Sequence, residues 1–141
     1  MVTDPRSAPA QQSLQLILAR NLISTLSTAA FIVDPDGTVV FYNEAAGDFV
    51  GMSYEETGKV PLSELRAALA PVDAEGRPID PAELPVAIAV REQRPVHETH
   101  RARPPHEDEL TVEILALPLI GPDDIHEGTI VVFWPHAGGS Q

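Results

Sequence analysis

Leucines recur at every fourth position near the start of the chain, and the stripe they form comprises Leu14, Leu18, Leu22 and Leu26. Residues four apart lie above one another on one face of an α-helix, so this pattern predicts a helix over residues 11–26. Because Leu16 and Ile23 lie off the stripe, the helix is apolar on more than one side. We expect one side to pack on its own domain and the leucine stripe to meet a partner. A helix wrapped entirely within its own domain is the alternative.

Two runs rich in β-branched and aromatic residues, 30–33 and 38–43, flank the turn sequence Asp34-Pro35-Asp36-Gly37. Proline presets the second position of a turn, and Gly37 can adopt the left-handed conformation that closes a short hairpin. Strict alternation in the second strand places Val39 and Phe41 on one face, with Val40 and Tyr42 on the other.

The middle of the chain predicts short helices. Asn43 can cap a helical stretch over residues 44–50 that Gly51 ends, and Ser53 and Glu56 have the spacing of a capping box. Residues 61–70 form a further amphipathic segment. Pro85 cannot donate a hydrogen bond inside a helix, so a tight turn near residues 80–83 precedes a helix that opens near Pro85 and runs to about residue 93.

The last third of the chain predicts three strands, over residues 96–103, 110–120 and 128–134. In the second of these, Leu110, Val112 and Ile114 point inward. Loops rich in Pro, Asp and Gly separate the strands, which indicates an antiparallel meander. The whole pattern predicts an α+β fold with a five-stranded antiparallel sheet, short helices on one face and an N-terminal flanking helix. We expect residues 1–10 to be a flexible leader, 11–26 the flanking helix, 27–135 the domain and 136–141 a flexible tail.

Composition narrows the function. A hydrophobic fraction of 43% in 141 residues supports one packed core. The formal charge of −12 would repel phosphate backbones, so we expect no nucleic-acid partner. The chain has no cysteine, which excludes disulfides, thiolate catalysis and a cysteinyl–chromophore bond. The start lacks the pattern of a signal peptide and no run approaches the ~18 apolar residues of a membrane span, so we expect a cytoplasmic protein.

Several segments together resemble a known family. The run FIVDPDGTVVFYNEAA (residues 31–46) resembles the opening of a PAS domain, and FVGMSYEE (49–56) resembles its next segment. ELPVAIAVR (83–91) resembles the long helix of that family, and GTIVVF (128–133) its last strand. The resemblance covers residues 20 to 135. It implies a sheet whose inner face and helices enclose a pocket, and a role in sensing, dimerisation or partner contact.

On this resemblance we expect a small ligand in the sheet–helix pocket. The candidate lining residues are Phe31, Val39, Phe41, Leu65, Leu69, Ile88, Val112, Ile114 and Val132. Phe133 and Trp134 point to opposite faces of the last strand, so one fills the core and the other lies on the outer face, where PAS-like domains often meet a partner. The candidate dimer or partner residues are Leu14, Leu18, Leu22, Leu26 and Trp134.

Other candidate chemistry is weaker. His97 and His100 lie three apart on a strand and therefore face opposite ways, so we expect no metal site there. His97 alone is a candidate axial haem ligand, but a solvated histidine is the simpler interpretation, and nothing indicates a haem or a flavin. His106, His126 and His136 fall in loops or the tail. Arg91, Arg94, Arg101 and Arg103 can bind an anionic ligand or pair with neighbouring acids.

Three functions stay open at this stage. The first is a sensory module that binds a small ligand and signals through a homodimer or another signalling protein. The second is an interaction module with a filled core, and the third is a small enzyme, for which no catalytic constellation is visible. No output region is visible either, so the output lies in another chain or the sequence is a piece of a longer protein.

Overall fold

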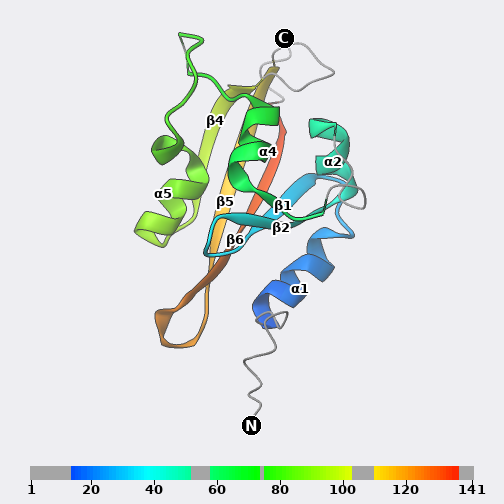
Figure 1. Ribbon diagram of the computed structural model, residues 1–141, viewed down its shortest axis with the longest axis vertical. Coiled ribbons are helices and arrows are strands. Elements are labelled where there is room, and N and C mark those ends of the chain that lie inside the picture. The colour runs from blue at the N-terminus through cyan, green and yellow to red at the C-terminus, as the bar shows by residue number, and fades with distance from the viewer. Residues whose placement is uncertain (1–13, 52–57, 74, 103–109, 137–141) are drawn as a thin grey trace.

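The computed structural model describes residues 14–51, 58–73, 75–102 and 110–136. They form an antiparallel sheet with helices on both faces (Figure 1). The strand order is β3-β2-β1-β6-β5-β4. The strands are β1 (Ala29–Val33), β2 (Thr38–Tyr42), β3 (Val60–Pro61), β4 (Val96–Ala102), β5 (Leu110–Ile120) and β6 (His126–Pro135). The helices are α1 (Leu14–Ile23), α2 (Glu44–Val50), α4 (Leu62–Leu69) and α5 (Pro85–Glu92), with single 3-10 turns at Pro81–Glu83 and Pro122–Asp124.

The predicted α+β fold is confirmed, with one strand more than expected. The extra strand, β3, has two residues and pairs with the start of β2 through Thr38–Pro61 and Val39–Val60. Two residues show no alternation, so no sequence pattern could reveal this strand. The proposed capping box at Ser53 and Glu56 lies outside the described residues.

The predicted hairpin between β1 and β2 is confirmed. Gly37 adopts a φ of 87°, in the left-handed region that favours glycine. The Asp34 carboxylate accepts hydrogen bonds from the backbone N–H groups of Asp36 and Thr38, at 2.9 and 3.0 Å. Local turn chemistry therefore accounts for the carboxylate of Asp34.

The alternation predicted for β2 is wrong because the strand contains a β-bulge. Ile32 pairs with Phe41 but Val33 pairs with Val39, so Val40 is an extra residue in the ladder. An extra residue reverses the phase of the strand. Val39 therefore joins Tyr42 in the inner core, while Val40 and Phe41 lie on the outer face under α1.

The outer face of the sheet is covered in part by α1. Leu16, Ala19 and Ile23 are buried against Ile32 and Ile130 of the two central strands. Arg20 adds a cation–π contact, with its guanidinium carbon 4.5 Å from the centre of the Phe41 ring. The helix ends at Ile23, three residues earlier than expected, and residues 11–13 are not described. The residues off the predicted stripe thus form the packing face.

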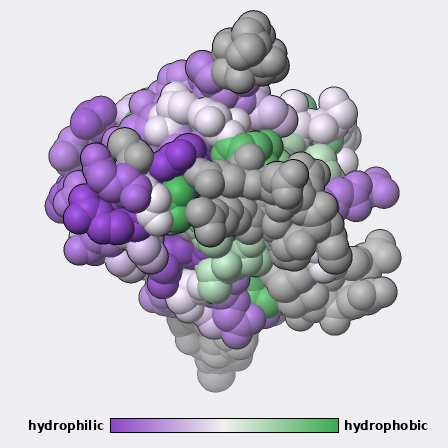
Figure 2. Space-filling model, turned by 90° about the horizontal axis from the view of Figure 1, so that it is seen from above, coloured by the Kyte–Doolittle hydropathy of each residue, from purple (hydrophilic) through white to green (hydrophobic). Residues whose placement is uncertain are grey.

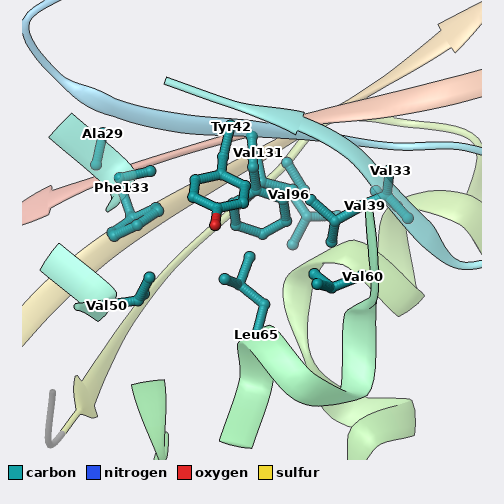
Figure 3. Packing of buried hydrophobic residues seen from close by; sticks show 14 residues of the cluster. Ala29, Val33, Val39, Tyr42, Val50, Val60, Leu65, Val96, Val131 and Phe133 are labelled. Atoms are coloured by element: carbon teal, nitrogen blue, oxygen red, sulfur yellow. The ribbon is translucent and has the colours of Figure 1, made fainter. Parts of the chain in front are cut away.

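The inner core lies between the sheet and helices α2, α4 and α5. In Figure 3, Leu65 projects from α4 toward Tyr42 and Val131 on the sheet. The ring of Phe133 makes edge-to-face contacts with Phe31 and Phe49, with centroids 6.0 and 5.1 Å apart. These aromatic contacts fill the end of the core near α2.

Asn43 joins three elements at the end of β2. Its side-chain oxygen accepts from Ala46 N–H, which caps α2 as the sequence predicts, and also from Ala30 N–H in β1. Its side-chain amide donates to the carbonyls of Ile23 at 3.0 Å and Thr28 at 2.9 Å. The residue is 3% exposed, so these bonds are shielded from water. Asn43 therefore connects the end of α1 to the core.

Candidate functional site

A cavity of about 60 Å³ lies between the inner face of the sheet and the helices. The sheet side of its lining comprises Phe31, Ala102, Val112, Ile114, Val131 and Phe133. The helix side comprises Leu62, Leu65, Arg66, Pro71, Leu84, Pro85 and Val86. All of these residues except Arg66 are apolar, so the pocket suits an apolar group.

The helix side of the pocket is positioned by turn chemistry. The Asp80 carboxylate accepts from Ala82 N–H and opens the 3-10 turn over Pro81–Glu83. Leu84 is extended, and Pro85 takes the first position of α5, where the missing N–H costs nothing. The sequence predicted this turn and this helix start, and both are confirmed. Together they direct Leu84 and Pro85 into the pocket.

The pocket brings together four of the nine residues expected to line it, namely Phe31, Leu65, Val112 and Ile114. Val39 and Ile88 belong to the same core but do not line the cavity. Leu69 lies in α4, and its side chain is outside the described residues.

The two remaining residues lie on the other face of the sheet. Phe41 is turned there by the bulge in β2, and Val132 packs with the α1 cluster. On β6 the inward residues are Val131 and Phe133, one position out of phase with the expectation. Trp134 lies on the opposite face from Phe133, as expected. Because residues two apart share a face of a strand, an inward Phe133 implies an inward Val131 and an outward Val132.

Arg66 is the one charged residue among the described residues that line the pocket, and no sequence pattern indicated it. Arg91, Arg94 and Arg101, which were expected to bind an anion or pair with acids, do not line the pocket. Arg94 pairs with Glu92 at 2.6 Å, while Arg91 and Arg101 donate to backbone carbonyls. Arg103 is outside the described residues. No periodicity marks Arg66, because its place in the pocket depends on how α4 docks on the sheet.

The pocket does not fit a haem or a flavin. Its volume of about 60 Å³ is well below the roughly 300 Å³ at which drug-sized ligand pockets begin. No histidine is among the described residues that line it. His97 lies on the outer face, where its Nε2 donates to Glu113 Oε1 at 2.8 Å. The sequence-based candidate for an axial ligand therefore faces away from the cavity.

A polar cluster occupies the outer face near the end of β6. Glu113 accepts from His97 and from Nδ1 of His136, the latter at 2.7 Å to Oε2. These bonds, the one from His136 first, hold the pKa of Glu113 below its ordinary value. The ring of Trp134 stacks on His97 with centroids 5.8 Å apart. Trp134 is thus half-buried within this cluster.

Other sites are not formed by the described parts of the chain. His100 bonds to Glu98 at 2.8 Å on the inner face, opposite His97, as the alternation predicts. Within the ranges given above, no three potential metal ligands come together. None of the described helices is long and apolar enough to cross a membrane. Among the coloured residues in Figure 2, hydrophilic ones predominate and hydrophobic ones appear only in small areas.

An antiparallel sheet that encloses a pocket with its helices and carries a flanking helix on its outer face defines an α+β domain. The family model described as the PAS fold matches residues 18–134, and the chain belongs to the PAS family. It is therefore a PAS-type sensory domain of signal transduction. Members of this family are generally non-catalytic, and they commonly dimerise or contact signalling partners.

Solved structures agree with this fold. The PAS domain of a protein from Colwellia psychrerythraea is 16% identical, with a TM-score of 0.62, over 88% of this chain and 98% of that one. The PAS domain of BvgS from Bordetella pertussis is 16% identical, with a TM-score of 0.59, over 86% and 85% of the two chains. A LOV protein of Rhodobacter sphaeroides is 14% identical, with a TM-score of 0.61, over 86% and 66%. A search of curated proteins found no match.

Proposed function

We propose that this domain binds a small ligand in the sheet–helix pocket and transmits the binding event to α1. The observation that carries the proposal is the apolar cavity bounded by both the sheet and the helices. In this proposal the domain acts in the cytoplasm, as a homodimer or with a signalling partner or output domain that α1 or Trp134 contacts.

The central strands supply a physical route between the pocket and α1. Phe31 of β1 and Val131 of β6 are paired and line the cavity. The next pair, Ile32 and Ile130, faces the opposite way and packs with α1. A ligand that displaces Phe31 or Val131 must shift the backbone of the same strands, because packed cores deform little. Such a shift would change the packing of α1 on the outer face of the sheet.

The ligand can be sought in the purified chain. Native mass spectrometry together with an absorption spectrum should show extra mass that is released on denaturation. A chromophore band is not expected, given the size of the pocket. A bare mass, with no small apolar molecule taken up on titration, would contradict ligand binding.

Movement of α1 can be followed separately. Because the chain has no cysteine, Leu18→Cys provides a unique attachment point for a spin label on the exposed face of α1. Ligand should change the label's mobility or its distance to a second copy. A label placed at Ile125→Cys, on an exposed turn, is the control and should not respond. If both labels stay unchanged on ligand binding, α1 does not receive the signal.

The dimer proposal rests on the leucine stripe. Leu14, Leu18 and Leu22 are 68, 56 and 58% exposed, and Leu26 beyond the helix is 38% exposed. A helix face of this kind buries its apolar area readily against a second copy. Leu18→Glu with Leu22→Glu should shift the solution mass to that of a monomer without loss of the fold. Ile125→Glu, at a comparable exposed apolar residue, should leave the mass unchanged. A monomeric unsubstituted chain would contradict the proposal.

An interaction module with a filled core is the second candidate. It is favoured by the small cavity and by the aromatic contacts of Phe133 that fill the core beside it. This candidate predicts that no ligand binds while the leucine stripe still determines the solution mass. The two experiments together therefore separate a sensor from a docking module.

A further inference from the structure

We propose that the ligand of this pocket is a small uncharged molecule of hydrocarbon character, with about four heavy atoms and no hydrogen-bonding group. This inference rests on the proposed function, because it specifies the ligand class of the same pocket. Three observations carry it: the cavity volume of about 60 Å³, the almost wholly apolar surface that the described residues present to the cavity, and the hydrogen bonds that engage the backbone around it.

The backbone on the sheet side of the pocket is engaged in the ladders. Phe31 pairs with Val131 between β1 and β6, and Ile114 pairs with Phe133 between β5 and β6. Each of these three strands has a hydrogen-bonded neighbour on both sides, so its N–H and C=O groups bond within the plane of the sheet. The side chains that these four residues direct into the pocket are apolar. A ligand therefore meets only carbon along these strands.

The backbone on the helix side is engaged in the same way, even where it is irregular. Leu62 N–H donates to the Gly37 carbonyl at 2.9 Å, and the Pro71 carbonyl accepts from Ile79 N–H at 3.3 Å. Pro71 and Pro85 have no N–H of their own. A hydroxyl, amide or carboxylate that entered this pocket would lose its hydrogen bonds to water without replacing them, and that loss disfavours a polar ligand.

Arg66 does not change this conclusion. It is charged, yet the surface that faces the cavity is almost wholly apolar. Long charged side chains commonly lay their methylene stems along apolar surface and keep the charged group in water. The stem of Arg66, rather than its guanidinium, therefore supplies its share of the lining. The formal charge of −12 further disfavours an anionic ligand.

The volume of the cavity limits the size of the ligand. A water-sized group needs roughly 10–15 Å³ of a cavity, so about 60 Å³ holds roughly four to six such groups. An apolar cavity of about 150 Å³ binds benzene, and this pocket has less than half of that volume. The two comparisons together indicate a ligand of about four heavy atoms, smaller than an aromatic ring.

The test uses isobutene, acetone, acetamide and acetate, which have nearly the same planar shape and differ in their polar groups. Each is titrated into the unsubstituted chain, and binding is followed by backbone amide shifts. Isobutene should bind at least tenfold more tightly than the other three, because it alone gives up no hydrogen bond to water on entering. Nuclear Overhauser contacts from its methyl groups to Leu65, Val112 and Phe133 should place it in the pocket. Benzene should bind more weakly than isobutene.

A substitution in the lining tests the location. Val112 is buried and lines the cavity, so Val112→Phe should fill the volume and abolish isobutene binding. Val90→Phe, at an exposed residue of α5 that is not among the lining residues, is the matched control and should bind isobutene as the unsubstituted chain does. The comparison of the four molecules in the unsubstituted chain decides the matter even if Val112→Phe does not fold.

The outcomes separate this inference from the proposed function. If acetone, acetamide or acetate binds as tightly as isobutene, the hydrocarbon inference is overturned and the pocket is still a ligand site. If benzene binds as tightly, the size limit is overturned. If none of these molecules binds, the inference fails, and the mass of the purified chain then decides the proposed function: extra mass released on denaturation supports it, and a bare mass contradicts it.

Discussion

The side chain of Asn43 makes more hydrogen bonds than its sequence context indicates. Its spacing predicted a helix cap, and the structure adds bonds to Ala30 N–H and to the carbonyls of Ile23 and Thr28. Those partners come from segments 13 to 20 residues away. The residue therefore connects the flanking helix to the core as well as capping α2.

Replacing Asn43 should cost far more than losing a cap. Asn43→Ala leaves several buried donors and acceptors without partners, so the free energy of unfolding should fall by about 2–4 kcal/mol. Asp80→Ala removes an exposed capping bond and should cost only about 1 kcal/mol. Urea denaturation of both variants measures the difference. Equal losses would show that the bonds to α1 and β1 contribute nothing.

Glu113 should make stability depend on pH in the acid range. The bonds from His136 and His97 lower its pKa in the folded state, so its contribution is fully present above the unfolded value of about 4.3. That contribution is lost as pH falls through the lower folded pKa. Glu113→Gln should therefore lower Tm at pH 7, and the gap to the unsubstituted chain should close below about pH 4.

Thermal denaturation from pH 7 to pH 3 measures this gap. Glu64→Gln, an exposed residue of α4, is the control and should follow the unsubstituted chain throughout. A gap for Glu113→Gln that is constant over the whole range would mean that its carboxylate acts by packing rather than by charge.

At the scale of elements, α1 depends on a close approach to β6. A Cβ built on Gly128 would lie 2.7 Å from Leu16 Cδ2 and 3.0 Å from the Val33 carbonyl oxygen. Its φ of 151° is also one that other residues rarely adopt. Glycine at this position thus allows α1 to settle on the sheet.

Gly128→Ala should loosen α1 and lower the free energy of unfolding by about 2–4 kcal/mol, through overpacking and backbone strain together. Amide hydrogen exchange should rise along Leu14–Ile23. Gly76→Ala separates the two causes, because Gly76 also has a positive φ but has no atom within 4 Å of its built Cβ. If Gly76→Ala costs as much, the contact with Leu16 is not the reason.

At the scale of the molecule, the two faces of one sheet have different tasks. The inner face lines the pocket. The outer face packs against α1 and carries the polar cluster around Glu113. The net charge of −12 acts on any association of two copies, because each dimer brings two such charges together.

The proposed homodimer should therefore tighten with salt. Raising NaCl from about 0.05 to about 0.5 M shortens the screening length severalfold, which weakens the repulsion while the leucine contacts persist. Analytical ultracentrifugation should show a lower dimer Kd at high salt. The double variant Leu18→Glu and Leu22→Glu should stay monomeric at both concentrations. A Kd that rises with salt would indicate ion pairs in place of leucines.

Features that depend on a few neighbouring residues were predictable from the chain alone. The Asp34–Gly37 turn, the cap at Asn43 and the start of α5 at Pro85 follow from local backbone chemistry. The bounds of β5 followed from its hydrophobic run and the turn-rich segments beside it. Together with the family resemblance, these signals were enough to predict the fold.

Other features are set by the tertiary structure and could not be predicted from the sequence. The bulge at Val40 reverses the faces of β2 only when β1 pairs with it, and β3 exists only because α4 brings two residues to the sheet edge. Two sides of α1 are apolar in the sequence, so the sequence does not say which side is buried. The buried side is set by the close contact between Leu16 and Gly128 on the sheet. Arg66 becomes part of the pocket lining through the docking of α4. Register, docking and cavities arise from contacts between distant residues, and a one-dimensional pattern contains no record of those contacts.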